Sequence, residues 1–372
     1  PGAGFLMAIV LAMICGGLQG GTNLFFDWRA LALGIGVYGV FAMWLQTADQ
    51  VQWAVELFAG FMAVRLALIY AEFLRGGGDA ILGVRIPVYD GPTQSALVFT
   101  AVLAVCLGDY AGGWPRALWN GLAGASYLLV MLCFRRTFWA VLGVATLLAF
   151  LLQRRRRGQK LLLAAAAFAA VTVLLGPTFY QRIQSMDFTQ GETEFSQSNP
   201  DHVGEVLDAW EQVEKNPLLG IGLGRSFQTL RIPGWKEESV MVHNAPLHVW
   251  LKYGLLGLGC YLWFHAALLW WLYRQRGKFK NQSELPFPRF GGARFPAPSA
   301  AMAYREYAES HDLALVSAVL VYLAAQFVVS LGFTPWPYSS VQSTILIAFR
   351  LALAIRGANL WNYQLSPSSL RR

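Results

Sequence analysis

The chain has 372 residues, of which 56% are hydrophobic and only 13% are charged. A soluble domain carries about twice that charged share, so the composition excludes an ordinary soluble protein and predicts a helical membrane protein. The formal net charge of +8 does not indicate nucleic-acid binding, because the densest basic clusters, at residues 153–160 and 273–280, flank apolar runs, where membrane topology explains them.

Apolar runs that approach the length of a membrane span recur along the chain. A transmembrane helix needs about 20 predominantly apolar residues. The candidates are residues 4–18, 28–45, 51–73, 93–107, 114–133, 137–152, 161–180, 247–273, 313–331 and 339–355. We therefore predict an all-α polytopic membrane protein with about ten transmembrane helices.

Basic loops set the predicted orientation, because cytoplasmic loops carry an excess of Lys and Arg. The four arginines at 154–157 and the basic residues at 274–280 are predicted to be cytoplasmic. Residues 75–92, the junction at 135–136 and the loop at 181–242 then share the opposite, outward face. The predicted regions are an N-terminal transmembrane bundle at 1–180, an outward loop at 181–242, and C-terminal transmembrane helices at 243–372 with a cytoplasmic connector at 274–312.

The outward loop is too long for a passive connector in a compact bundle. Its residues 201–215 have apolar side chains at helical spacing, which predicts an amphipathic helix lying on the membrane surface. These side chains are Val203, Val206, Leu207, Trp210 and Val213. The Asn216-Pro217 pair ends the predicted helix.

Three alternate glycines, Gly220, Gly222 and Gly224, follow this helix. They form either a stretch of open backbone whose amides face an anion, or a tight turn that packs the surface helix against a span. A nucleotide-binding glycine run is excluded, because no predicted strand precedes it and no acidic ribose partner follows in a βαβ unit.

A second motif joins the polar loop to the next apolar run. Residues 242–257 read VHNAPLHVWLKYGLLG, which places His243 and Asn244 where water meets membrane. Together with the surface helix and NPLLGIGLG at 216–224, this motif resembles the O-antigen ligase and O-antigen polymerase superfamily of bacterial envelopes. Members show a Pro-Leu-hydrophobic-Gly-hydrophobic-Gly turn, then a His-Asn that opens a helix containing a Gly-hydrophobic-hydrophobic-Gly pair. The resemblance covers roughly residues 201–269.

The resemblance implies a GT-C-like, metal-independent inverting glycosyltransferase of the bacterial inner membrane, with no cofactor and with an active site that faces the periplasm. Its donor would be a glycan on undecaprenyl diphosphate. A ligase moves that glycan to lipid A–core in lipopolysaccharide biosynthesis, and a polymerase moves it to another repeat unit. The residues leave both open, and we favour the ligase because the outward loop is single and compact. The expected partners are the lipid-linked donor, the lipid A–core or glycan acceptor, and the bilayer, with no nucleic acid.

His243 is the candidate catalytic residue. The reaction must remove a proton from an acceptor hydroxyl, and an imidazole exchanges protons near neutral pH. The alternative is a histidine that caps the span or hydrogen-bonds in the interface. No zinc site is expected, because His248 lies about 140° from His243 around a helix and the cysteines have no CxxC spacing.

Arginines on the predicted outward face are candidates for diphosphate binding, because their planar donors match phosphate oxygens. They are Arg136, Arg135, Arg182, Arg225 and Arg231. Adjacent helical residues point about 100° apart, so at most one of Arg135 and Arg136 faces the site. Arg136 is favoured, because many family members have an arginine that opens a corresponding span. In the alternative interpretation each arginine of the loop is an ordinary solvated charge.

Four further residues are candidate supporting or acceptor-side groups, namely Asn244, His202, Glu205 and Glu238. Many family members carry an arginine near the start of the surface helix, where this chain has His202 and Glu205. These two residues either orient the acceptor, or replace His243 as the base, or face water. Glu238 lies just before the histidine motif and is a candidate orienter of His243.

A transporter or flippase of lipid-linked saccharide is the competing functional class, because it would also need arginines around a polar cavity. It predicts ionisable residues near the midplanes of spans and interrupted helices in two related halves. The sequence has no internal repeat, and its candidate charges gather on one predicted face. This pattern favours the enzyme.

Overall fold

The computed structural model describes residues 2–24, 40, 43–45, 48–81, 84–87, 91–109, 111, 113–133, 135–152, 157–184, 198–231, 238–239, 242–283 and 300–330. The helices are α1 (Gly2–Leu18), α3 (Ala48–Leu74), α4 (Gly91–Gly108), α5 (Gly113–Leu132), α6 (Arg136–Leu152), α7 (Arg157–Gln184), α8 (Ser198–Lys215), α9 (Ala245–Ser283) and α10 (Ala300–Ser330). Two antiparallel strand pairs, β1 (Asp79–Ile81) with β2 (Val84–Ile86) and β3 (Phe227–Gln228) with β4 (Glu238–Ser239), are a small addition to the predicted all-α fold.

Most of the predicted spans coincide with a helix of the structure. The exceptions are the run at 28–45, which lies mainly outside the described residues, and the run at 339–355, which lies wholly outside them. Within the described residues, Gln50–Leu74, Ala245–Gly277 and Asp312–Ser330 are long and apolar enough to cross a membrane. Helices α1, α4, α6 and α7 contain shorter apolar segments. The structure thus supports a multi-pass membrane protein, and the number of about ten spans stays a prediction.

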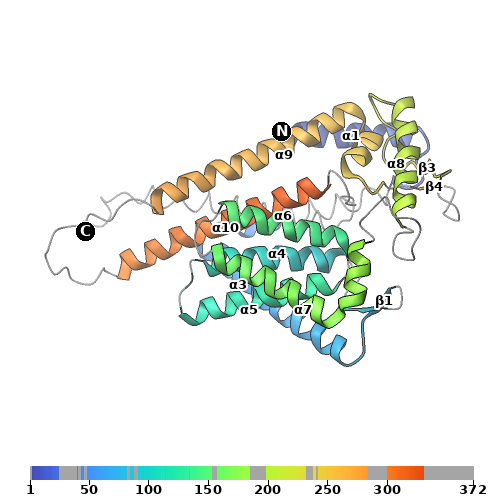
Figure 1. Cartoon of the computed structure of the whole chain (residues 1–372). Coiled ribbons are helices and arrows are strands. Elements are labelled where there is room, and N and C mark those ends of the chain that lie inside the picture. Colours follow the sequence, from blue (N-terminus) through green and yellow to red (C-terminus); the bar gives the residue numbers. More distant parts are fainter. Residues whose placement is uncertain are drawn as a thin grey trace, which may run out of the picture.

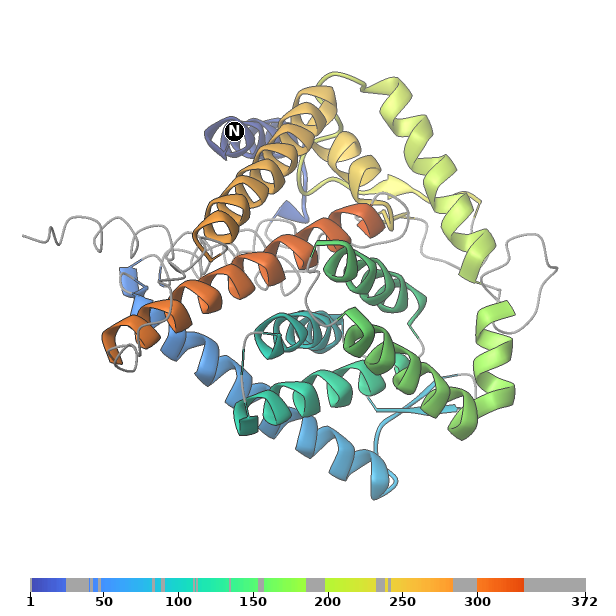
Figure 2. The same ribbon diagram turned by 60° about the vertical axis from the view of Figure 1, so that its left-hand side comes forward.

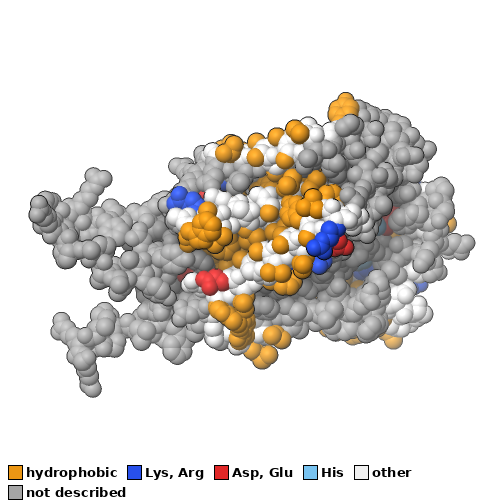
Figure 3. All heavy atoms as spheres, turned by 90° about the horizontal axis from the view of Figure 1, so that it is seen from below, with side chains coloured by type: hydrophobic (Ala, Val, Ile, Leu, Met, Phe, Trp, Pro, Cys, Tyr) orange, Lys and Arg blue, Asp and Glu red, His pale blue; other side chains and the backbone are white. Residues whose placement is uncertain are grey.

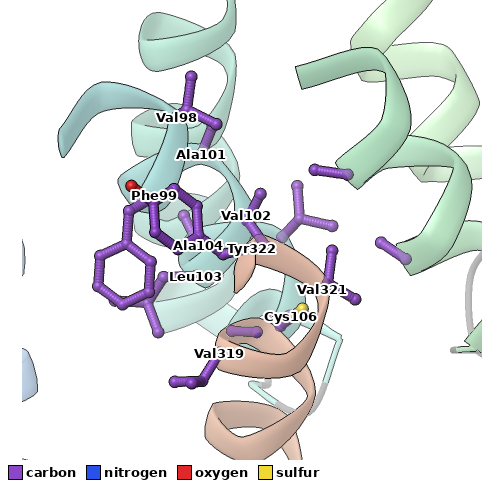
Figure 4. Close-up of a cluster of buried hydrophobic side chains, with 14 of the residues drawn as sticks. Val98, Phe99, Ala101, Val102, Leu103, Ala104, Cys106, Val319, Val321 and Tyr322 are labelled. Carbon is purple, nitrogen blue, oxygen red and sulfur yellow. The ribbon is translucent and has the colours of Figure 1, made fainter. Parts of the chain in front are cut away.

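Helix α4 forms the core of the bundle and contacts α3, α5, α6 and α10 (Figures 1 and 2). Its residues 97–107 are all buried, and so are residues 313–323 of α10. A helix that is apolar all round needs this environment. Figure 4 shows side chains of α4 and α10 packed together, including Phe99 and Tyr322, whose ring centroids are 5.0 Å apart. The Tyr322 hydroxyl also hydrogen-bonds Ser95 Oγ at 2.6 Å.

The outer faces of several bundle helices are apolar. In α3 the side chains of Phe61, Val64 and Leu68 are exposed, and in α5 that of Leu118 is exposed. Figure 3 shows one face of the molecule where apolar side chains fill the middle and charged ones lie toward its two ends. A helix surface of this kind fits lipid contact along the spans with charges at the membrane boundaries.

A buried ion pair joins two bundle helices. Lys160 near the start of α7 donates to the Asp109 carboxylate just after α4, and their side chains are only 2% and 5% exposed. A buried lysine and a buried carboxylate are each costly without a partner, so the pair fixes the start of α7 against the end of α4.

One end of the bundle collects the segments that were predicted to share the outward face. Figure 1 shows β1, α8, β3 and β4 at the same end. Ile86 of β2 packs with Leu132 and Trp139, which flank the α5–α6 junction. The shared end agrees with the predicted grouping of residues 75–92, 135–136 and 181–242. The side of the membrane on which this end lies stays a prediction.

Candidate active site

Helix α8 lies across the end of the bundle, beside the start of α9 (Figures 1 and 2). It was predicted as an amphipathic helix lying on the membrane surface, and the sequence left open whether Glu205 faces water or the site. The predicted helix is confirmed, but its polar face is turned inward: Glu205 and Asp208, one helical turn apart, are both 1% exposed. Of the apolar residues, Val213 is buried and Val203, Leu207 and Trp210 are exposed. Both buried carboxylates therefore have protein partners.

The first partner is His243. Its ring Nδ1 lies 2.8 Å from Glu205 Oε2, and its backbone N–H donates to the same oxygen at 3.0 Å. The His243 side chain is 24% exposed, whereas that of Glu205 is 1% exposed. A carboxylate accepts the proton carried on Nδ1, and Nε2 then holds the lone pair. A carboxylate that orients an imidazole in this way leaves Nε2 able to accept a proton.

Asn244 places this histidine at the start of α9. Its side-chain Oδ1 accepts a hydrogen bond from Leu247 N at 3.0 Å, which is an N-cap, and its carbonyl accepts one from His248 N at 2.8 Å. Val242, the residue before His243, is held by the buried ring of His248, because Val242 N lies 3.4 Å from His248 Nδ1. The backbone on both sides of His243 is thus fixed.

The second buried carboxylate, Asp208, binds Arg231 of the loop that leads from α8 to α9. Asp208 accepts hydrogen bonds from the backbone N–H and the guanidinium of Arg231, and Glu211 lies 3.3 Å from the same guanidinium. The hydrogen bonds from Glu211 and Asp208 raise the pKa of Arg231 above its ordinary value. Arg231 therefore lies against α8 and pairs with two of its acids.

The glycine turn packs against two helices. Ile221 N donates to Leu251 O of α9 at 2.7 Å, and Leu223 N donates to Ala12 O of α1 at 3.0 Å. Gly220 has φ +69°, and a Cβ on it would lie 2.5 Å from Leu251 O. Of the two interpretations left open by the sequence, these amides support the tight packing turn.

Gly254 shows how closely the turn approaches α9. It lies inside the predicted span at 247–273. In the structure Gly254 has φ +69° and interrupts the helix, and a Cβ there would lie 2.0 Å from Leu218 O. Residues 245–253, which follow His243, therefore form a short helical segment that is separate from the long span after Gly254.

Arg225 follows the glycine turn and bonds a residue just after α1 and a lysine of α9. Its guanidinium donates to Gln19 Oε1, which follows α1, and its carbonyl accepts a hydrogen bond from Lys252 of α9. Lys252 is fully buried. Arg225 is thus fixed at the junction of α1, the turn and α9.

The other predicted site residues lie in several elements. Arg135 and Arg136 are half-buried at the α5–α6 junction. Arg182 lies in α7, His202 in α8 and Glu238 in β4, but their side chains are outside the described part of the structure. The contacts of these residues with His243 stay predictions. Among the described residues no group of three or more metal-ligating side chains could hold a metal ion.

Sequence reasoning did not single out Asp208 and Lys252. Asp208 follows Glu205 by three residues, so the two acids share one helix face. That spacing places both acids on one side of α8, but it does not tell whether that side meets water or protein. Lys252 stands alone among apolar residues of the VHNAPLHVWLKYGLLG motif, and a lone lysine there indicates a buried or interfacial cation.

Comparisons with curated proteins and with solved structures found no match. Residues 121–262 match the family model described as O-Antigen ligase. The matched region contains the α5–α6 junction, α8, the glycine turn and His243. This match supports the resemblance seen in the motifs: residues 121–262 are similar to the O-antigen ligase and O-antigen polymerase superfamily.

Proposed function

We propose that this protein is a membrane glycosyltransferase that moves a glycan from undecaprenyl diphosphate to an acceptor hydroxyl. In the favoured form it is an O-antigen ligase that transfers O-antigen to lipid A–core. The family match supports a lipid-linked glycan substrate and a membrane environment. The proposal places the protein in the bacterial inner membrane with its active site toward the periplasm.

The Glu205–His243 pair is the observation that carries this proposal. Attack on a diphosphate-linked sugar requires an acceptor hydroxyl that gives up its proton as the new bond forms. His243 is partly exposed and held by a buried carboxylate through Nδ1, so Nε2 is the atom proposed to take the proton. As that happens, the Glu205 carboxylate stabilises the imidazolium. The acceptor oxygen attacks the anomeric carbon from the side opposite the diphosphate, which leaves with its electron pair, so the configuration inverts.

The leaving diphosphate needs positive charge in place of a metal. Arg136 is the first residue of α6, where the N-terminal end of the helix adds positive potential to the guanidinium. Arg225 is held at the glycine turn close to the start of α9. We propose these two, with Arg182, as the diphosphate clamp. Arg135 is the alternative to Arg136, since at most one of the two adjacent residues faces the site. Arg231 is assigned instead to holding the loop, because Asp208 and Glu211 share its guanidinium.

The polymerase of the same superfamily is the second candidate, because the family match covers both branches. The two functions use the same donor and the same base, and they differ in the acceptor. The Glu205–His243 pair supports either one. The single compact loop between α7 and α9 is the reason for favouring the ligase.

Product analysis in reconstituted membranes tests the proposal. Purified protein is mixed with an undecaprenyl diphosphate glycan and with lipid A–core, or with the donor alone. We expect glycosylated lipid A–core in the first mixture and no chain extension in the second, and the His243→Ala protein is the negative control. Chain extension by the donor alone would identify the polymerase. Movement of the donor across proteoliposomes with no change in covalent linkage would contradict both and support a flippase.

A further inference from the structure

One side of α8 carries apolar side chains that are about half exposed. Val203, Leu207 and Trp210 are 49%, 49% and 43% exposed. They lie within about 60° of one another around the helix, given 100° per residue. We call these three residues the α8 strip. Trp210 presents an apolar ring here, since its indole N–H donates to Glu214 Oε1 at 2.6 Å.

The strip cannot turn toward the protein without breaking buried contacts. On the opposite side of α8, Glu205 bonds His243 and Asp208 bonds Arg231. Removing either buried carboxylate from its partner would leave an unpaired charge in the interior. The two pairs therefore fix the rotation of α8, with the strip on the side of the helix opposite these contacts.

The α8 strip continues into the apolar surface of a candidate membrane span. Trp210 makes an edge-to-face contact with Trp250, at a centroid distance of 5.4 Å, and the Trp250 indole donates to Pro217 O at 3.0 Å. The next residues, Leu218 and Leu219, are exposed. They lie beside α9, because Leu255 N donates to Pro217 O at 2.9 Å.

On α9 the exposed apolar surface goes on past the kink. Leu255 and Leu256 are exposed, as are Leu262 and Trp263 farther along the helix. These residues belong to Ala245–Gly277, one of the segments long and apolar enough to cross a membrane. One apolar surface thus runs from α8 over the turn onto a span.

We propose that the bilayer covers the α8 strip, and that α8 lies in the membrane interface with Val203, Leu207 and Trp210 among the lipids. The bilayer is the occupant because it also surrounds the α9 surface with which the strip is continuous. The crosswise course of α8 over the end of the bundle is the course of an interfacial helix (Figures 1 and 2). Tryptophan is the residue typical of such boundaries.

This docking has a consequence for the site, which rests on the proposed function. Glu205 lies on the side of α8 opposite the strip, so a helix held by lipid fixes the depth of the Glu205–His243 pair. The diphosphate of a lipid-linked donor lies at the same boundary. The docking itself does not depend on the reaction, so the two claims can fail separately.

Spin-label accessibility in lipid nanodiscs tests the docking. In a background where the four native cysteines are replaced, single cysteines at Leu207→Cys and Leu219→Cys are labelled with a nitroxide. Leu256→Cys on α9 is the lipid reference, and Gln228→Cys, an exposed polar position on β3, is the water reference. Relaxation by oxygen and by a water-soluble nickel chelate is then measured.

We expect the labels at positions 207 and 219 to match position 256, with an oxygen-to-nickel ratio several-fold above that at position 228. A label at 207 that behaves as the one at 228 would show that the strip faces water and would overturn the proposal. Shielding from both reagents would indicate that a protein surface covers the strip and would also overturn it.

A second measurement keeps the proposal testable if the cysteine-free protein does not fold. A benzophenone amino acid replaces Leu207 in the protein with its native cysteines, and the nanodiscs are irradiated. The docked helix predicts adducts with lipid. Adducts with a second polypeptide, or no adducts with lipid when a benzophenone at position 256 gives them, would overturn it.

Discussion

Two buried carboxylates of this protein have basic partners of different kinds. Asp109 in the bundle pairs with Lys160, and both side chains are almost fully buried. Glu205 at the end of the bundle pairs with His243, whose side chain is 24% exposed. The first pair is closed off inside the protein, whereas the imidazole of the second pair reaches the surface.

The difference separates a contact that supports the fold from one that can take part in a reaction. The Asp109–Lys160 pair joins α4 to α7, and nothing about it requires access to a substrate. The Glu205–His243 pair has one buried member and one that reaches the surface. The predictions below test this contrast, ordered by their effect on glycan transfer.

Replacing His243 has the largest expected effect. In His243→Ala the base is lost, and transfer should fall between about a hundredfold and ten-thousandfold, the usual contribution of general base catalysis. Initial rates of transfer in reconstituted membranes measure the effect. His265→Gln is the matched control, because His265 is buried in α9 and bonds Tyr261 O; its transfer rate should stay close to that of the native protein.

Neutralising Glu205 has the next largest effect. Glu205→Gln keeps the size and the acceptor for His243 N but removes the charge. A hydrogen bond to a charged group contributes about 1.5–3 kcal/mol, so the rate should fall roughly tenfold to a hundredfold. The rate is compared with that of Glu211→Gln, a partly exposed position on the same helix. Equal transfer rates for Glu205→Gln and Glu211→Gln would contradict a role of Glu205 in the reaction.

The N-cap at Asn244 has a smaller effect. Asn244→Ala removes the acceptor of Leu247 N, which costs about 1 kcal/mol of helix stability and loosens the backbone of His243. We expect transfer to fall by several-fold and the melting temperature to decrease. Asn244→Asp retains a side-chain cap and should keep both close to native values. A loss with Asp as large as that with Ala would assign Asn244 a role beyond capping.

Replacing residues of the Asp109–Lys160 pair should leave the rate of glycan transfer per folded molecule unchanged. Lys160→Met leaves a buried carboxylate without its partner and should destabilise the fold by about 3–5 kcal/mol. Replacing both residues, as Lys160→Met with Asp109→Leu, should recover most of that stability. Thermal unfolding in detergent and the transfer rate per folded molecule are measured together. A reduced rate in the stable double variant would contradict the contrast between the two pairs.

The sequence predicts much of this fold, because long apolar runs in α3, α4 and α10 have few alternatives to a helix. It also predicts α8 and the glycine turn, and it singles out His243, whose catalytic role stays a prediction. It does not predict which way α8 faces. The amphipathic pattern is the same whether Glu205 and Asp208 meet water or protein, and only the return of the chain at Arg231 and His243 decides between them.

The sequence also does not predict the break in α9 at Gly254. A glycine in an apolar helix fits close packing equally well with a helical or a left-handed backbone. The left-handed conformation follows from the approach of Leu218 and Leu219, which lie more than thirty residues earlier in the chain. Contacts of this kind are set by the tertiary fold and leave no local signal.

A double-mutant cycle between Glu205 and His243 tests the central claim most directly. Transfer rates are measured for the native protein, Glu205→Gln, His243→Ala and the double variant, in the same membranes and per folded molecule. If Glu205 acts through His243, Glu205→Gln slows the native protein but has no further effect once His243 is alanine. Equal fractional losses in both backgrounds, or full transfer by His243→Ala, would contradict the account.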